Sequence, residues 1–182
     1  LTNQFSQNLL NLIKSTAIFV DDKAQLAGLS DAEITAAAEG AKAAGQDGKY
    51  IIKLTNTTRQ PILAQLENRA LRQQVWEASA NRGTSGEFNN QPLVARLAQI
   101  RAERAKLLGF DSYADYSLGR AMAKKPQAVY DMFGSMVPAV VANAKQEAAE
   151  IQQMIKQSGG DFEVQPWDWE FYAEKVRKAK YD

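Results

Sequence analysis

The sequence contains neither cysteine nor histidine. Without cysteine, disulfide bonds and thiol chemistry are excluded, which is the usage expected of a cytoplasmic protein, with the periplasm as the alternative. Without histidine, the commonest general base is missing. Histidine and cysteine are also the two side chains that zinc favours most, and the chain has neither. We therefore expect no catalytic and no metal-binding residue in this chain, and the sequence alone singles out no substrate-binding residue.

Excess charge of either sign is also lacking, because 22 lysines and arginines face 21 acidic residues and give a net charge of +1. This balance offers no electrostatic reason to expect a nucleic-acid or membrane partner. No apolar run approaches the roughly 18 residues of a membrane-spanning helix. Residues 1–20 are amphipathic rather than typical of a signal peptide.

What is present is typical of a soluble globular domain: 182 residues, 45% hydrophobic and 24% charged. That length is enough to bury one packed core. The chain starts at Leu1 without a methionine, and the last helical pattern runs to Asp182 without a glycine or proline stop signal. We expect residues 1–182 to be a single segment of a longer polypeptide, truncated at both ends.

Helical periodicity dominates the sequence. Phe5, Leu9 and Leu12 describe a first amphipathic helix that the aspartates at 21 and 22 end or follow. Ser30 and Glu33 form a capping-box pattern at the start of a second helix, which Gly45 is expected to end. The further expected elements are one or two helices from 60 to 80, a loop over 81–90, a helix over 92–109, an aromatic connector over 110–116, and helices over 126–157 and 168–180. Pro138 is expected to kink the longest of these.

One segment, residues 49–54, has the β-branched and aromatic composition of a strand. A strand needs a partner, which lies either in a small hairpin or sheet or outside this chain. Asn56, Thr57 and Thr58 match a glycosylation acceptor, but a turn after the strand is the better interpretation. The expected fold class is mostly α: a multi-helix domain with one short strand or small sheet.

Several local patterns suggest chemistry only weakly. Glu147 and Glu150 share a helix face, but carboxylate metal sites in helix bundles normally include histidines, so a solvated face is expected. Residues 83–86 (GTSG) lack the lysine and spacing of a phosphate-binding loop and are expected to be a flexible connector. No spacing among the serines and lysines marks a nucleophile and base pair.

Arginines and aromatic residues are concentrated in separate parts of the chain. The arginines accompany Glu67, Glu77 and Glu103 on helices, which favours an ion-paired surface over nucleic-acid binding. They are Arg69, Arg72, Arg96, Arg101 and Arg104. Residues 165–172 (QPWDWEFY) hold four aromatic side chains around Asp168, which can cap a helix. The rings are expected to pack in a core, with a ligand-facing wall as the alternative.

Four stretches together resemble the thimet oligopeptidase family of zinc peptidases, and within it the bacterial peptidyl-dipeptidase branch. They are residues 22–29 (DKAQLAGL), 54–61 (LTNTTRQP), 107–116 (LLGFDSYADY) continuing into 122–124 (MAK), and 165–177 (QPWDWEFYAEKVR). The resemblance covers essentially the whole chain in order. It implies a mostly helical, two-lobed peptidase with a deep substrate channel and one zinc held by a His-Glu-x-x-His helix and a more distant glutamate.

This chain departs from the family pattern at the zinc site, because it contains no His-Glu-x-x-His. In the family that motif lies downstream of the matched region. The resemblance therefore implies a non-catalytic helical wall of the channel in a peptidase that releases dipeptides from the C-termini of oligopeptides. Zinc and oligopeptide substrate would belong to the parent protein, whose remaining polypeptide would be this segment's partner.

Two other interpretations remain open. A free-standing helical module could bind peptides or proteins without catalysis, and an initiator methionine and a stop codon flanking the segment would favour it. An enzyme that uses carboxylates or a serine and lysine pair is the third. Under the first interpretation, apolar faces left uncovered by the missing remainder could drive dimerisation of the isolated segment.

Overall fold

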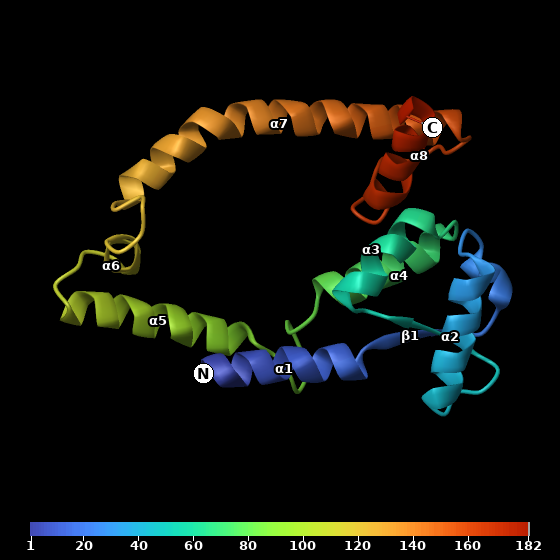
Figure 1. Ribbon diagram of the computed structural model, residues 1–182, viewed down its shortest axis with the longest axis horizontal. Coiled ribbons are helices and arrows are strands. Elements are labelled where there is room, and N and C mark those ends of the chain that lie inside the picture. Colours follow the sequence, from blue (N-terminus) through green and yellow to red (C-terminus); the bar gives the residue numbers. More distant parts are fainter. Residues whose placement is uncertain (182) are drawn as a thin grey trace.

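A computed structural model describes residues 1–181, except for the side chains of residues 14, 56–58 and 60. The described part is mostly helical with a two-stranded sheet, as the sequence predicts (Figure 1). Its elements in order are α1 (Thr2–Ser15), β1 (Ala17–Val20), η1 (Lys23–Leu26), α2 (Asp31–Ala43), β2 (Tyr50–Lys53), α3 (Asn56–Gln65), α4 (Arg69–Ala80), α5 (Gln91–Leu107), α6 (Tyr113–Leu118), α7 (Pro126–Gln157) and α8 (Trp169–Tyr181).

The expected strand is β2, and its partner lies inside the chain. β1 pairs with β2 in antiparallel register, with Ala17 opposite Lys53 and Val20 opposite Tyr50. The sequence prediction missed β1, because it let the first helix approach Asp21. The helix ends at Ser15 instead, since the following run AIFV is apolar throughout and rich in residues that favour strands.

The second helix begins as its capping box predicts. The Ser30 hydroxyl accepts a hydrogen bond from the Glu33 backbone N–H at 3.3 Å, and the Ser30 backbone N–H donates to the Glu33 carboxylate at 2.9 Å. The Ser30 hydroxyl also donates to the Glu33 carboxylate at 2.6 Å, and this bond is the largest cause of a lowered pKa at Glu33, followed by the bond from the Ser30 backbone N–H. α2 ends at Ala43, and Gly45 follows with a φ of 77°, the left-handed conformation expected of a C-terminal stop.

The prediction of a turn at residues 56–58 is wrong, because these residues are the first three of helix α3. The Arg59 backbone N–H donates to the Thr55 carbonyl at 2.9 Å, so the helix begins before residue 60, where the sequence predicts its start. The side chain of the glycosylation-type Asn56 lies outside the described residues. Pro61 sits inside the helix, beyond its first turn, where its missing N–H removes one intrahelical hydrogen bond.

A first core fills the space between the sheet, η1 and the helices α3 and α4. Its buried residues are Val20, Leu26, Ile52, Leu54, Ile62, Leu63, Leu66, Leu71 and Val75. α2 covers the sheet from one side, with Ile34 packed against this core. Burial of such side chains contributes about 1.5–3 kcal/mol each, so this core is the main source of stability in the N-terminal half.

The chain then leaves this core along α5 and returns along α7. α5 and the loop over 81–90 lie where the sequence predicts them. The connector over 110–116 is not entirely irregular, since Ser112 caps the short helix α6 by accepting from the Asp115 backbone N–H. The 32-residue α7 is continuous through Pro138 and changes direction in its first half (Figure 1).

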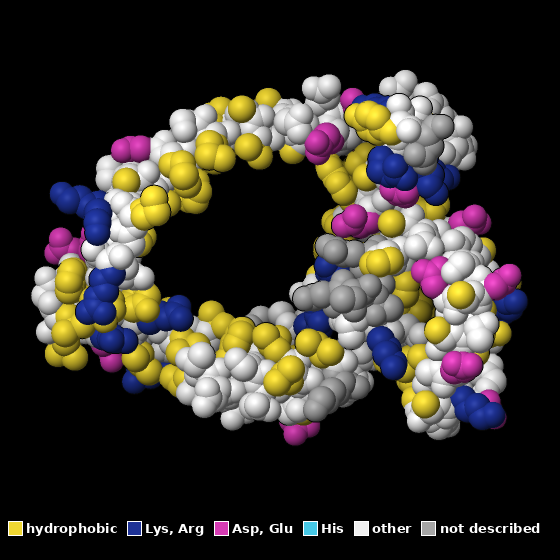
Figure 2. All heavy atoms as spheres, viewed as in Figure 1, with side chains coloured by type: hydrophobic (Ala, Val, Ile, Leu, Met, Phe, Trp, Pro, Cys, Tyr) yellow, Lys and Arg dark blue, Asp and Glu magenta, His cyan; other side chains and the backbone are white. Residues whose placement is uncertain are grey.

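A second core forms where the end of α7 meets α8. It contains Ile151, Ile155, Phe171 and Tyr172, with Phe162 of the connecting loop packed against it. Because α8 also packs beside α3, the chain encloses an open centre bordered by α5, α6 and α7 on one side and the first core on the other (Figures 1 and 2). In the part of the chain that the structure describes, no helix combines the length and apolar character needed to cross a membrane.

Gly28 provides a test of how η1 is held against α3. Its φ is 96°, and a Cβ there would overlap the carbonyl oxygen of Gln65. Gly86 has a similar φ of 70°, but a Cβ there would meet open space. We expect Gly28→Ala to lower the free energy of unfolding by about 3 kcal/mol or more, and Gly86→Ala by only about 1 kcal/mol, because both incur backbone strain and only the first adds a clash. Urea unfolding followed by circular dichroism measures both, and equal losses would contradict the packing described here.

Candidate functional site

The most constrained polar group in the described structure is Asp168, whose side chain is fully buried just before α8. Arg72 of α4 donates to one carboxylate oxygen from Nη2 at 3.0 Å. Arg69, one turn earlier on α4, donates to both oxygens, from Nε at 3.0 and 3.2 Å and from Nη2 at 2.8 Å. The Gln165 backbone N–H adds a bond at 3.1 Å. Asp168 is therefore saturated with donors.

Arg72 is itself buried, with 1% of its surface exposed, and its remaining donors are satisfied by backbone carbonyls. Nη1 donates to the carbonyls of Leu66 and Glu67 at 2.8 and 3.0 Å, and Nε donates to the Trp167 carbonyl at 3.2 Å. Its guanidinium also lies 4.2 Å from the centre of the Phe171 ring. A buried charge is tolerated only when it is paired and hydrogen-bonded in this way.

This cluster corrects one sequence prediction and decides another. Arg69 and Arg72 do not belong to an ion-paired surface, since their carboxylate partner is Asp168 and Arg69 stacks 4.0 Å from the centre of the Phe162 ring. The aromatic segment packs as a core: Phe171 and Tyr172 are buried with ring centroids 5.1 Å apart. The Asp168 carbonyl, rather than a free carboxylate, begins α8 by accepting from the Tyr172 N–H.

The other three arginines lie on the surface, as predicted. Arg96 pairs with Glu103 at 3.3 Å. Arg104 donates to the Tyr116 hydroxyl at 2.8 Å, and Arg101 lies 5.3 Å from the centre of the Tyr113 ring. These contacts fasten α6 to the end of α5 and form no stripe of free positive charge.

Glu147 and Glu150 do not act together. Glu147 accepts from Asn143 at 2.7 Å, and Glu150 accepts from Lys180 of α8 at 2.7 Å. The hydrogen bond from Lys180 is the largest cause of a lowered pKa at Glu150, and the same contact raises the pKa of Lys180. The GTSG segment forms turns, and the Gly83 carbonyl accepts from the Asn90 N–H at 2.7 Å.

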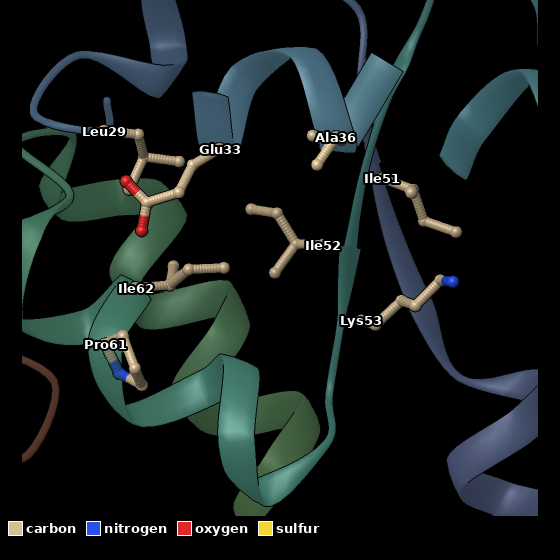
Figure 3. Close-up of a pocket in the computed structure, with 9 residues that line it drawn as sticks. Leu29, Glu33, Ala36, Ile51, Ile52, Lys53, Pro61 and Ile62 are labelled. Atoms are coloured by element: carbon tan, nitrogen blue, oxygen red, sulfur yellow. The ribbon is translucent and has the colours of Figure 1, made fainter. Parts of the chain in front are cut away.

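An apolar hollow of about 360 Å³ lies between α2, β2 and α3 (Figure 3). Ile52, Ile62 and Leu29 form its walls, and among the described lining residues Glu33 and Lys53 carry charge. The Glu33 carboxylate is already engaged by Ser30 in the capping box. The hollow can hold an apolar group, but its lining supplies no free nucleophile and base pair.

The described residues do not fit a zinc site. Zinc in proteins is held by histidine, cysteine and carboxylate groups, and the chain lacks the first two. Nowhere within residues 1–181 do three potential ligands gather in a way that could hold a metal ion. No catalytic step can therefore be derived from a metal bound to this chain.

The remaining candidate surface is the wall of the open centre. Figure 2 shows hydrophobic side chains gathered along the edges of α5 and α7 that border this space. Exposed apolar residues on these helices include Val94, Ile100, Phe133 and Val140. A surface of this kind suits contact with another polypeptide better than chemistry.

Comparison with known proteins assigns the family. The model of peptidase family M3 matches residues 62–182, and the chain therefore belongs to that family of peptide-bond hydrolases. It is 45% identical over its whole length to dipeptidyl carboxypeptidase of Escherichia coli K12 and 43% identical to that of Salmonella typhimurium. Oligopeptidase A of Salmonella typhimurium is 32% identical, again over the whole chain. The chain spans 27% of the length of each of these relatives.

Asp168→Asn tests the buried cluster. Loss of the negative charge leaves Arg72 buried without its counter-ion, so we expect the free energy of unfolding to fall by about 3 kcal/mol. Glu174→Gln is the matched control, because Glu174 forms surface ion pairs with Arg177 and Lys178, whose loss should leave the free energy of unfolding nearly unchanged. Chemical denaturation of both variants measures the difference, and an Asp168→Asn protein as stable as the control would show that the cluster is dispensable.

The Glu150 contact with Lys180 predicts a pH dependence of the α7–α8 packing. A lowered pKa means that the contact stabilises the fold above the ordinary value of 4.5 and is lost as the pH falls through the lowered value. In an NMR titration of the Glu150 carboxyl carbon, we expect Lys180→Gln to raise the pKa of Glu150 toward 4.5. Lys178→Gln, which removes a neighbour of Glu174 instead, should leave Glu150 unchanged. An unmoved titration in the Lys180 variant would rule the contact out in solution.

Proposed function

We propose that this chain is a non-catalytic helical part of a zinc-dependent peptidyl-dipeptidase, which releases dipeptides from the C-termini of oligopeptides. The observation that carries the proposal is the similarity over the whole chain, which is higher to the dipeptidyl carboxypeptidases, at 45%, than to oligopeptidase A, at 32%. The coverage of 27% of those relatives supports a segment of a longer protein. The zinc ligands would lie outside residues 1–182.

The contribution of this segment is positional. Helices α5 and α7 border an open centre, and the buried cluster of Asp168, Arg69 and Arg72 fixes α8 against α4. A rigid frame of this kind would form part of a channel wall that admits extended peptides and excludes folded proteins. It would also fix where a peptide meets the metal, which is worth a large share of any rate enhancement.

A second candidate function is a stand-alone module that binds peptides or proteins without catalysis. The exposed apolar side chains of α7, such as Phe133 and Val140, favour it, since a binding module needs a surface of this type. The parent reading frame distinguishes the two candidates. A His-Glu-x-x-His sequence downstream supports the peptidase, and a stop codon directly after residue 182 supports the module.

The direct test compares the 182-residue chain with the product of the full parent reading frame. We expect the full product to release C-terminal dipeptides from a short peptide, to lose that activity with a chelator and to regain it with zinc. The short chain should show no dipeptide release above buffer at the same concentration. Mass spectrometry of the products measures both, and zinc-dependent turnover by the short chain would overturn its non-catalytic role.

A further inference from the structure

Helix α7 carries one continuous apolar stripe along its length. The stripe follows spacings of three and four residues, which place its members on one side of a helix. Its members are Val129, Tyr130, Phe133, Met136, Val137, Val140, Val141, Ala144, Ala148, Ile151, Met154 and Ile155. One surface therefore extends from the first turn of α7 to its last.

Only the last part of this stripe is covered. Ile151 and Ile155 are 3% and 0% exposed, because Phe171 and Tyr172 of α8 pack on them in the second core. The covering helix reaches Glu150, where Lys180 donates its hydrogen bond. The established interface between α7 and α8 thus ends near residue 150.

The first part of the stripe continues in the same line without cover. Every residue from 131 to 147 is exposed. Phe133 is 50% exposed, Val140 is 59% exposed and Tyr130 is 67% exposed. Figure 2 shows hydrophobic side chains along the edge of α7 that borders the open centre, the side on which α8 also lies.

The composition of this uncovered part is not that of a solvated helix. Between Asp131 and Lys145 the sequence MFGSMVPAVVANA contains no charged residue. A surface helix normally alternates an apolar face with charged side chains, and one that is apolar or small on all sides is typical of a helix buried within a larger protein. Gly134, Ser135 and Ala142, off the stripe, are small enough to let a neighbour approach closely.

We propose that the uncovered stripe, from Val129 to Ala144, is a docking surface for an amphipathic helix from the rest of a longer polypeptide. This rests on the proposed function in one respect, that residues 1–182 are part of such a polypeptide. Two observations identify the occupant. The surface continues an interface that another helix of this chain already covers, and the chain spans only 27% of its relatives, so most of a protein of that length is left to supply the cover.

The test substitutes lysine at two exposed stripe residues, Phe133 and Val140, in the product of the full parent reading frame. The control is Gln153→Lys, at an exposed position off the stripe. If a helix covers the stripe, the double variant F133K/V140K buries two unpaired charges, and its thermal midpoint should fall by about 5 °C or more. The control should shift the midpoint by less than about 1 °C.

The second arm of the experiment repeats this comparison in the 182-residue chain, with the unsubstituted chain, the double variant and the control. Because Phe133 and Val140 are exposed in this chain, the double variant should keep the thermal midpoint of the unsubstituted chain, as the control does. An unchanged midpoint of the double variant in the full product would overturn the proposal. So would a reading frame that ends at residue 182.

The remaining possible occupant of the stripe is a second copy of this chain. Self-association of the short chain tests for it. Sedimentation over a concentration series measures whether the short chain dimerises. If F133K/V140K abolishes a dimer of the short chain and leaves the thermal midpoint of the full product unchanged, the stripe is a dimer interface and the proposal is overturned. Dipeptide release by the unsubstituted full product is measured separately. A full product without that activity would remove the proposed function, while the midpoint comparison would still decide whether the stripe is covered.

Discussion

The structure depends on one buried carboxylate. Asp168 receives donors from Arg69 and Arg72 on α4, and it stands at the start of α8, whose rings build the second core. α4 also contributes Leu71 and Val75 to the first core. This ion cluster links the two hydrophobic cores directly, together with the packing of α8 beside α3 and the contact between the Trp76 and Trp167 rings. Burial of the charges of Asp168 and Arg72 is costly, and it is tolerated here because their donors and acceptors are matched, with the partly exposed Arg69 adding a second cation.

Much of the fold could be predicted from the sequence, because its signals are local. The capping box at Ser30, the proline at 92 and the glycines after α2 and α7 mark helix boundaries that the structure confirms. β1 and the early start of α3 were missed, since a four-residue strand is decided by its partner and the first turn of α3 by backbone bonding to Thr55. Neither the pairing of β1 nor the start of α3 can be predicted from the local sequence pattern.

The candidate site was less predictable, since its key contact joins residues about a hundred positions apart in sequence. Arg72 lies in phase with the buried Val75 and Ser79 of α4, which was a signal that it faces the interior. Nothing in one sequence pairs it with Asp168, and so it was assigned to the surface. The family resemblance, by contrast, needed no geometry, because it rests on ordered stretches spread over the whole chain.

The short helix α6 has a consequence for how this architecture can vary. It is held to α5 mainly by Arg104 and Tyr116 and contributes no buried residue to either core. The entropic cost of lengthening such a connection grows only slowly with the number of added residues. Insertions around residues 110–125 should therefore be tolerated where insertions near Asp168 are not, so that evolution can change the span of the frame without disturbing its anchor.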